Sequence, residues 1–201
     1  MLKVGLTGSI AVGKSFVLTI LSELGCHVLD ADKTAREVVS PGMPGLKEVS
    51  KAFGEGILKP DGTLDRAKLG TIVFADESKR LQLNSILHPF IISAQDEQLR
   101  EFEQGDQNGI AVVDAALMIE SGSYRRFDKV IVVHCRSEVQ LERLIARDGI
   151  SSAEAEKRIA AQMPQEEKKK YADFLIDTSK GFEATRDRTK EVFAALQKLN
   201  G

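Results

Sequence analysis

The chain has 201 residues, of which 42% are hydrophobic and 29% are charged, a composition typical of one globular domain with a buried core. Its formal net charge of −2 is unfavourable for nonspecific binding to nucleic acid or to an anionic membrane, because both require a basic surface. No apolar run approaches the roughly 20 residues that span a bilayer and no secretory signal is recognisable, so we expect a cytoplasmic protein that binds neither nucleic acid nor membrane.

The first predicted elements are a strand, a glycine-rich loop and a helix. Residues 2–7 form an apolar run typical of a buried strand, and apolar residues recur at steps of three and four from Phe16 to Leu24. The intervening sequence GSIAVGKS fits the pattern G-x-x-x-x-G-K-[ST] of phosphate-binding loops. The residues expected to bind a nucleoside triphosphate are Gly8, Ser9, Ile10, Ala11, Val12, Gly13, Lys14, Ser15 and Phe16.

Each part of this loop has a physical role. Gly13 allows a tight turn, so that successive backbone N–H groups can point at an anion. Lys14 can reach the β- and γ-phosphates from the start of the helix, and the Ser15 hydroxyl can ligate Mg²⁺. A flexible glycine turn with a solvated lysine is the alternative interpretation, but the position between strand and helix favours a nucleotide site.

Four further strands are expected at residues 27–30, 110–114, 129–135 and 174–177. Most of these runs are continuously apolar, which is typical of strands covered on both faces of a sheet. Helical patterns separate them, so the sequence predicts an α/β fold with a parallel sheet.

The long segment between the second and third strands predicts several helices of its own. They are expected at residues 33–39, 45–53, 65–74 and 77–103, with the last one broken or bent at Pro89. We expect this insertion, residues 33–104, to hold a second substrate. A second helical stretch covers residues 138–171, and the core then comprises residues 1–32, 105–137 and 172–201.

Three carboxylates lie where ligands gather in such folds, at the carboxyl ends of strands. Asp30 and Asp32 follow the second strand, and Asp114 closes the third. We expect Asp114 to bind Mg²⁺, a polar strand end or helix cap being the alternative. We expect Asp32 to act as a general base toward an acceptor hydroxyl, with a helix N-cap before Lys33 as an alternative that does not exclude catalysis.

Two arginines four residues apart, Arg143 and Arg147, share one face of a predicted helix. Their guanidinium groups suit the phosphates of a reacting nucleotide, and a solvated basic face is the alternative.

Other polar patterns are expected to be structural. The charged run at residues 166–170 is interpreted as a solvated helix surface. The pairs Cys26-His27 and His134-Cys135 are unsuited to zinc, because adjacent residues of a strand point to opposite faces, and core packing is the better account.

Further short motifs follow the phosphate loop along the chain. They are DADK at residues 30–33, GTLDR at 62–66, LNSILHP at 83–89, QLERL at 140–144 and AD at 172–173. This order resembles that of the dephospho-coenzyme A kinases over nearly the whole chain. The chain departs from the family in several places. Ser9 and Ala11 replace usual glycines, and Phe16 stands where threonine is frequent. Ala115-Ala116 replaces a motif with proline, and the fifth strand ends in Asp177-Thr178-Ser179, where the family often has asparagine.

The resemblance implies a P-loop kinase with a five-stranded parallel sheet, a helical acceptor-binding insertion and a helical lid over residues 138–171. It implies transfer of the γ-phosphoryl group of ATP, with Mg²⁺, to the ribose 3′-hydroxyl of dephospho-coenzyme A. Lys14, Arg143 and Arg147 would neutralise the transferred group, and Asp32 would be the base. The acceptor contacts implied are Asp32, Arg36, Arg66 and His88, although His88 could instead be a buried structural histidine.

Two other functions remain open at this stage. One is a kinase for another small acceptor, such as a nucleoside monophosphate. The other is a nucleotide-dependent switch, although the sequence contains no Asn-Lys-x-Asp guanine motif. We expect a monomer in either case.

Overall fold

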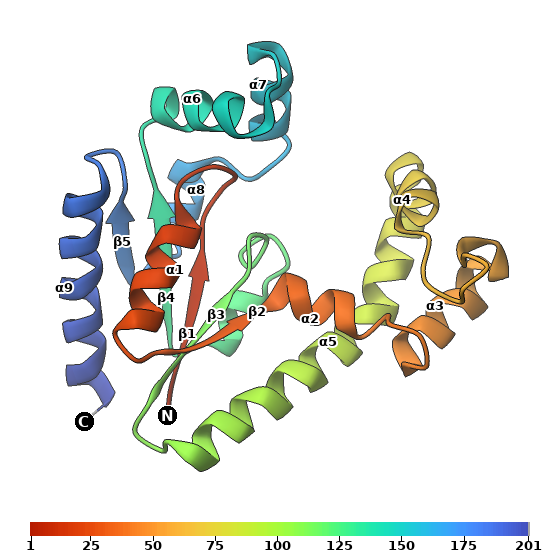
Figure 1. Cartoon of the computed structure of the whole chain (residues 1–201), viewed down its shortest axis with the longest axis horizontal. Coiled ribbons are helices and arrows are strands. Elements are labelled where there is room, and N and C mark those ends of the chain that lie inside the picture. Colours follow the sequence, from red (N-terminus) through yellow and green to blue (C-terminus); the bar gives the residue numbers. More distant parts are fainter. Residues whose placement is uncertain (201) are drawn as a thin grey trace. The chain divides into compact units, whose positions relative to one another are not determined.

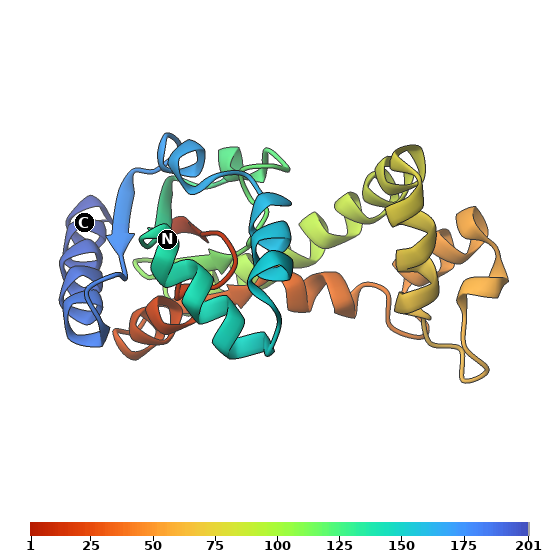
Figure 2. The same ribbon diagram turned by 90° about the horizontal axis from the view of Figure 1, so that it is seen from above.

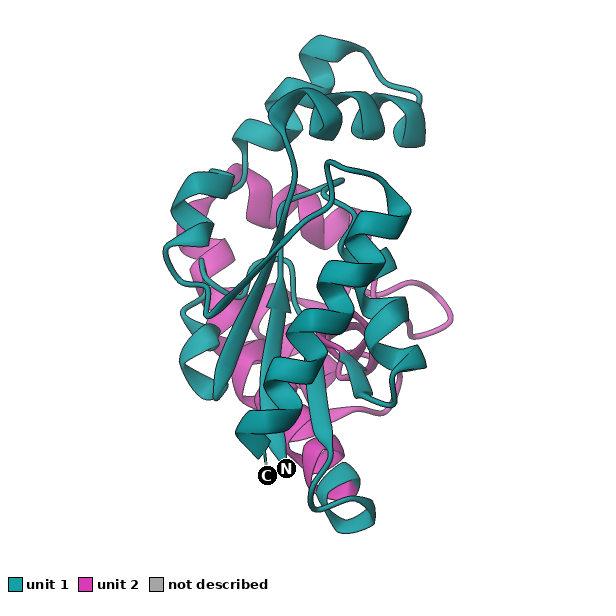
Figure 3. Ribbon diagram, turned by 90° about the vertical axis from the view of Figure 1, so that its left-hand side faces the viewer, with its two compact units in different colours: residues 1–29, 102–201 teal, residues 30–101 magenta. Residues whose placement is uncertain are grey.

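The computed structural model describes residues 1–200. The chain divides into two compact units, one formed by residues 1–29 with 102–201 and the other by residues 30–101 (Figure 3). The insertion expected at residues 33–104 falls in the second unit, except for residues 102–104.

A five-stranded sheet forms the centre of the first unit (Figure 1). Its strands are β1 (Leu2–Thr7), β2 (His27–Asp30), β3 (Ile110–Asp114), β4 (Lys129–His134) and β5 (Phe174–Asp177), arranged in the order β2-β3-β1-β4-β5. Strand β1 pairs in parallel with β3 and β4, and β4 pairs in parallel with β5. The predicted parallel α/β sheet is therefore confirmed, with one boundary changed, because β4 ends at His134 and not at residue 135.

The continuously apolar strands are explained by burial on both faces of the sheet. In β4, Ile131 and Val133 belong to a large hydrophobic cluster that also contains residues of α1 (Lys14–Glu23) and α9 (Phe182–Asn200). Val130 and Val132 of the same strand belong to a separate cluster with Ile119. Alternate residues thus face opposite sides, and each side is covered. The sequence pattern did not predict α9.

Three helices follow β4 in the region expected to be a lid. They are α6 (Ser137–Asp148), α7 (Ser152–Ala160) and α8 (Gln165–Lys169). Figures 1 and 2 show α6 and α7 beyond the carboxyl ends of β1 and β4. Gly149 ends α6 in the left-handed region, with φ of 65°, and the Ser151 side chain accepts a hydrogen bond from the N–H of Glu154 at the start of α7.

The second unit is helical and has its own hydrophobic cluster. Its elements are α2 (Ala31–Glu37), α3 (Pro44–Phe53), η1 (Glu55–Ile57), α4 (Arg66–Ala75) and most of α5 (Glu77–Gly105). Helix α5 is continuous through Pro89, so of the two predicted outcomes, a break or a bend, the break is wrong.

A short turn η2 (Ser123–Arg126) precedes β4 in the first unit. Among residues 1–200, no helix combines the length and apolarity needed to cross a membrane.

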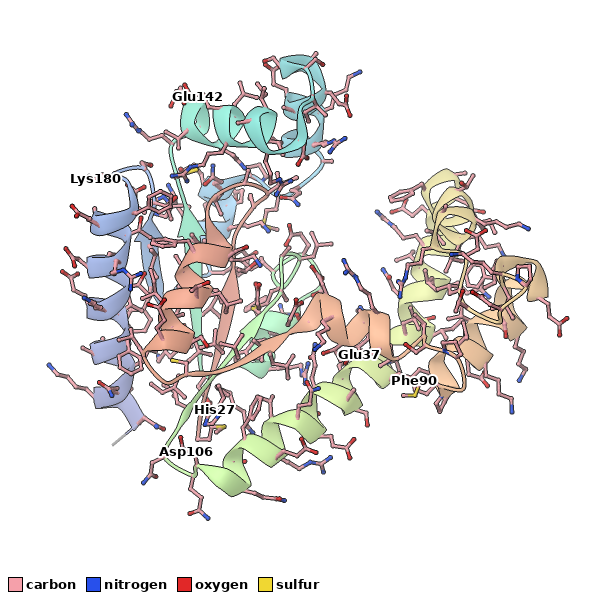
Figure 4. All side chains as sticks on the ribbon, in the orientation of Figure 1. His27, Glu37, Phe90, Asp106, Glu142 and Lys180 are labelled. Carbon is pink, nitrogen blue, oxygen red and sulfur yellow. The ribbon has the colours of Figure 1, made fainter. Side chains whose placement is uncertain are left out.

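The two cysteines have the structural role expected of them. Cys26 and Cys135 are free thiols buried in the large cluster, and burial raises the pKa of Cys26 to about 12. His27, next to Cys26, is the first residue of β2, and its Nε2 lies 3.1 Å from Oδ2 of Asp106 (Figure 4). Its ring also stacks on Phe102 at a centroid distance of 4.9 Å. These contacts bind β2 to the chain around the end of α5.

Candidate active site

The phosphate loop connects β1 to α1, as the sequence predicts, and two of its glycines are sterically required. A Cβ atom on Gly8 would lie 2.6 Å from the carbonyl oxygen of Val133 in the neighbouring strand. Gly13 precedes α1 with a φ of 88°, in the left-handed region that L-residues rarely adopt. The sequence thus places glycine where the backbone approaches β4 and where it turns into the helix.

Ala11 lacks this freedom, yet its φ is 60°. It occupies the third position of a turn in which the N–H of Val12 points to the carbonyl of Ser9 at 3.5 Å. A positive φ at this position favours glycine, and an L-residue there costs about 1–2 kcal/mol. Ala11, which replaces a glycine usual in the family that the sequence resembles, is therefore the strained residue of the loop.

A cavity of about 610 Å³ opens over this loop. It is lined by all eight residues of the predicted motif, Gly8, Ser9, Ile10, Ala11, Val12, Gly13, Lys14 and Ser15, and by Ala116, Arg143, Arg147, Gln162 and Phe182. The structure thus brings the predicted loop together with both predicted arginines. The volume is within the range of small-molecule sites.

Lys14 and Asp114 form an ion pair within the same region. Asp114 is in register with Leu6 across the β1–β3 pair, so the third strand ends beside the start of the phosphate loop. The Ser15 hydroxyl and the Asp114 carboxylate are oxygen donors of the type that Mg²⁺ prefers. Within residues 1–200 no cluster of three or more His, Cys, Asp or Glu could hold a metal by itself. Ser15 and Asp114 are two oxygen donors for a magnesium ion whose other ligands would come from phosphates and water.

Arg143 is held by the loop that follows β5. Its Nη1 donates to Thr178 Oγ1 at 2.8 Å, and its Nη2 donates to the Thr178 carbonyl at 2.9 Å. Thr178 Oγ1 in turn donates to the carbonyl of Val12 at 2.7 Å. Thr178 thus connects Arg143 to the phosphate loop.

Arg147 is more exposed and pairs with its neighbour Asp148. The two Nε–Oδ1 and Nη2–Oδ2 distances are 2.7 and 3.2 Å, and Arg158 donates to the same carboxylate at 2.9 Å. The hydrogen bond from Arg147 lowers the pKa of Asp148, and the same bond raises the pKa of Arg147. Arg147 is therefore a permanent cation at the cavity wall.

Phe16 contacts an aromatic residue that sequence reasoning missed. Its ring meets that of Phe182 edge to face, with centroids 4.9 Å apart. Phe182 is 74% exposed and lines the cavity at the start of α9. The sequence offered no signal for it, because α9 itself was not predicted.

The remaining predicted residues, Asp32, Arg36, Arg66 and His88, all lie in the second unit and are exposed. The N-cap of α2 is Asp30, whose Oδ1 accepts from the N–H groups of Asp32 and Lys33 at 2.8 and 3.0 Å. The alternative role of Asp32 as the cap is therefore wrong.

The structure also shows the surroundings of Arg66 and His88. Arg66 Nη2 donates to the carbonyl of Arg36 at 3.3 Å, so these two lie together. The alternative of a buried structural His88 is wrong, because that side chain is exposed.

One residue of the charged run at 166–170 corrects the prediction of a solvated surface. Lys168 is fully buried, and its Nζ donates to the carbonyl of Ala116 at 2.8 Å and pairs with Oε1 of Glu120 at 2.8 Å. The oxygen of Ala116 also accepts from Thr7 Oγ1 at 3.2 Å. The buried cation therefore fixes the turn that follows Asp114.

A second cavity, of about 540 Å³, lies at the start of α6 and includes His134. Burial lowers the pKa of His134, and the nearby charge of Lys169 lowers it further. Asp177 and Glu166 act in the opposite direction but do not offset the burial.

Comparisons with known proteins agree with this geometry. The family model described as dephospho-CoA kinase matches residues 2–183. A curated dephospho-CoA kinase of Shouchella clausii is 46% identical over 198 residues, which are 98% of this chain and 98% of that protein. A solved dephospho-CoA kinase from Campylobacter jejuni has a TM-score of 0.74 and 32% identity, covering 99% of this chain and 98% of that one. The solved TT1252 from Thermus thermophilus has a TM-score of 0.83 and 30% identity, with 96% of each chain covered.

Proposed function

This chain belongs to the dephospho-CoA kinase family, and on that premise we propose that it transfers the γ-phosphoryl group of ATP to the ribose 3′-hydroxyl of dephospho-coenzyme A. The products are coenzyme A and ADP, so the reaction is the last step of coenzyme A synthesis. The observation that carries the proposal is that one cavity is lined both by the phosphate loop and by two arginines.

Phosphoryl transfer requires mainly positioning and neutralisation of charge. The loop amides and Lys14 are assigned to the β- and γ-phosphates, because they line the cavity together. Arg143 and Arg147 are assigned to the charge that develops on the transferred group. Arg143 is preoriented by Thr178, whereas Arg147 must share its guanidinium with Asp148.

A magnesium ion is assigned to Ser15 and Asp114. When bound, it would supply additional positive charge to the phosphate oxygens. When the nucleotide binds, Lys14 would move from the Asp114 carboxylate to the phosphates. Lys168 supports this arrangement by holding the turn after Asp114 through the carbonyl of Ala116.

The acceptor is assigned to the helical insertion of residues 33–104. Asp32 would orient the acceptor hydroxyl and take its proton, a role that suits an exposed carboxylate whose helix is already capped by Asp30. Arg36, Arg66 and His88 are assigned to polar contacts with the acceptor. Residues 138–171 would act as a lid that excludes water, which otherwise competes for the phosphoryl group.

The proposed setting is the reducing cytoplasm, where the protein would act as a monomer. Both thiols are free and buried, which requires no oxidising compartment. Size-exclusion chromatography with light scattering, carried out at working concentration, would show a dimer if this part of the proposal were wrong.

An ADP-release assay with a panel of acceptors tests the reaction. We expect turnover with dephospho-coenzyme A and only background with coenzyme A, whose 3′-hydroxyl is already phosphorylated. Comparable turnover with adenosine monophosphate would instead indicate a kinase for nucleotides. Slow release of ADP that is independent of any acceptor would indicate a nucleotide-dependent switch.

A further inference from the structure

The tip of the phosphate loop is held from two sides by glutamine side chains. The N–H of Ile10 donates to Oε1 of Gln162 at 2.7 Å, and Nε2 of Gln140 donates to the carbonyl of Ile10 at 2.8 Å. Gln140 is 2% exposed, so its amide is almost fully removed from water. Neither glutamine belongs to the phosphate-binding motif, and they lie 130 and 152 positions away from Ile10 in the sequence.

A third glutamine, Gln165, fixes the orientation of the Gln140 side-chain amide. Nε2 of Gln165 donates to Oε1 of Gln140 at 2.7 Å, and Oε1 of Gln165 accepts from the N–H of Cys135 at 2.9 Å. A flipped amide in Gln140 would place its NH₂ group against that of Gln165 and its oxygen against the carbonyl of Ile10. The chain of bonds therefore runs in one direction, from the end of β4 to the phosphate loop.

The bond to the Ile10 carbonyl acts on the strained residue of the loop. Ile10 and Ala11 are the two central residues of the turn, and Ala11 has a φ of 60°. Turns with positive and negative φ at the third position interconvert when the peptide between the central residues flips. That peptide contains the carbonyl of Ile10 and the N–H of Ala11. A flip would relieve the strain on Ala11 but would break the hydrogen bond from Gln140.

We propose that Gln140 is a positioning residue, which holds the Ile10–Ala11 peptide in the orientation needed for nucleotide binding. The bond from the N–H of Ile10 to Gln162 lies in the preceding Ser9–Ile10 peptide. Gln140 is needed in this chain because residue 11 is alanine, which does not favour the left-handed region as glycine does. The inference rests on the proposed function only in taking ATP as the ligand of the loop.

The test is a double-mutant cycle read through ATP binding. Gln140→Met keeps the volume of the side chain and removes both hydrogen bonds. We expect it to raise the Kd for ATP about tenfold in the natural chain, because binding must then restore the strained turn. With Ala11→Gly as the background, the same substitution should raise the Kd only about twofold, since glycine adopts a positive φ freely.

Two further variants keep the test decisive if Gln140→Met is poorly folded. Gln165→Met removes the hydrogen bond that orients the Gln140 amide and should show the same dependence on residue 11. Gln95→Met removes an amide of similar burial in the second unit, and its Kd for ATP should equal that of the natural chain. Hydrogen exchange of the free protein should be faster at residues 10–12 in Gln140→Met and Gln165→Met, and unchanged in Gln95→Met.

Equal increases in Kd with alanine and with glycine at position 11 would overturn the proposal, as would an unchanged Kd in Gln140→Met and Gln165→Met. These results do not depend on the acceptor. A chain that binds ATP with the expected coupling but fails to phosphorylate dephospho-coenzyme A would contradict the proposed function and leave this inference standing.

Discussion

Lys14, at the start of α1, pairs with Asp114, at the carboxyl end of β3, and the two side chains are only 17% and 13% exposed. A lysine that binds phosphate must exchange this carboxylate for the nucleotide. The exchange is favourable because a triphosphate carries more negative charge than one carboxylate, and because the amides at the start of α1 hold the same phosphates. The pair thus keeps the cation in place before the nucleotide arrives.

Lys14→Met should therefore separate catalysis from folding. We expect turnover to fall by about 10²-fold or more, because a preorganised cation at the transferred group is lost. The free energy of unfolding should fall by about 3 kcal/mol, because the pair is largely buried, but the chain should still fold. Steady-state kinetics and urea unfolding on the same preparation measure the two effects. Lys3→Met, at the other end of β1, is the control and should keep full turnover. Normal turnover in Lys14→Met would remove Lys14 from the phosphates.

Arg147 and Arg158 bind the same carboxylate of Asp148, but only Arg147 lines the cavity. Arg147→Ala should lower kcat by about 10²- to 10³-fold with a smaller change in KM, because the guanidinium acts on the charge of the transition state. Arg143→Ala should do the same. Arg158→Ala removes an equivalent bond to Asp148 and should leave kcat near that of the natural chain. If the two cavity arginines change only KM, they serve ground-state binding.

The phosphate loop could be predicted from the sequence because its parts are consecutive. Gly8, Gly13 and Lys14 act through local backbone geometry, so their spacing alone carries the information. The strands could also be predicted from the sequence, because burial on both faces leaves continuous apolar runs. Their bounds were correct for four of the five strands, β4 being one residue shorter than expected.

Contacts between residues far apart in the chain could not be predicted from the sequence. Lys168 stands in a run of charged residues, and its partner Glu120 is 48 positions away, so no local pattern marks it as buried. The same holds for Gln140, whose contact with Ile10 spans 130 positions. The N-cap of α2 was misassigned for a different reason, because Asp30 and Asp32 both precede the predicted helix and only the actual helix start distinguishes them.

His134 should make the stability of the protein depend on pH. Its pKa in the folded protein is lowered by burial, whereas in the unfolded chain it is expected near 6.5. The unfolded chain therefore takes up the proton first as the pH falls, and the free energy of unfolding decreases below about pH 6.5. His134→Gln should remove this part of the decrease. Urea unfolding at pH values between 5 and 8 measures the difference between the two proteins, and a difference that is constant with pH would contradict the assignment.

The same substitution at two neighbouring aspartates tests the mechanism most directly. Asp32→Asn removes the negative charge and the basicity of the proposed base but keeps its size. We expect turnover with dephospho-coenzyme A to fall by about 10²- to 10⁴-fold, as is typical when a general base is lost. Binding of ATP should be unaffected, because the residues assigned to ATP belong to the first unit.

Asp30→Asn is the matched control, since asparagine caps helices about as well as aspartate. It should keep both turnover and stability, whereas Asp30→Ala should lower the free energy of unfolding by about 1 kcal/mol through loss of the cap. Because Asp30 already caps α2, a loss of turnover in Asp32→Asn cannot come from an uncapped helix. Turnover near that of the natural chain in Asp32→Asn would show that another group takes the proton from the acceptor hydroxyl.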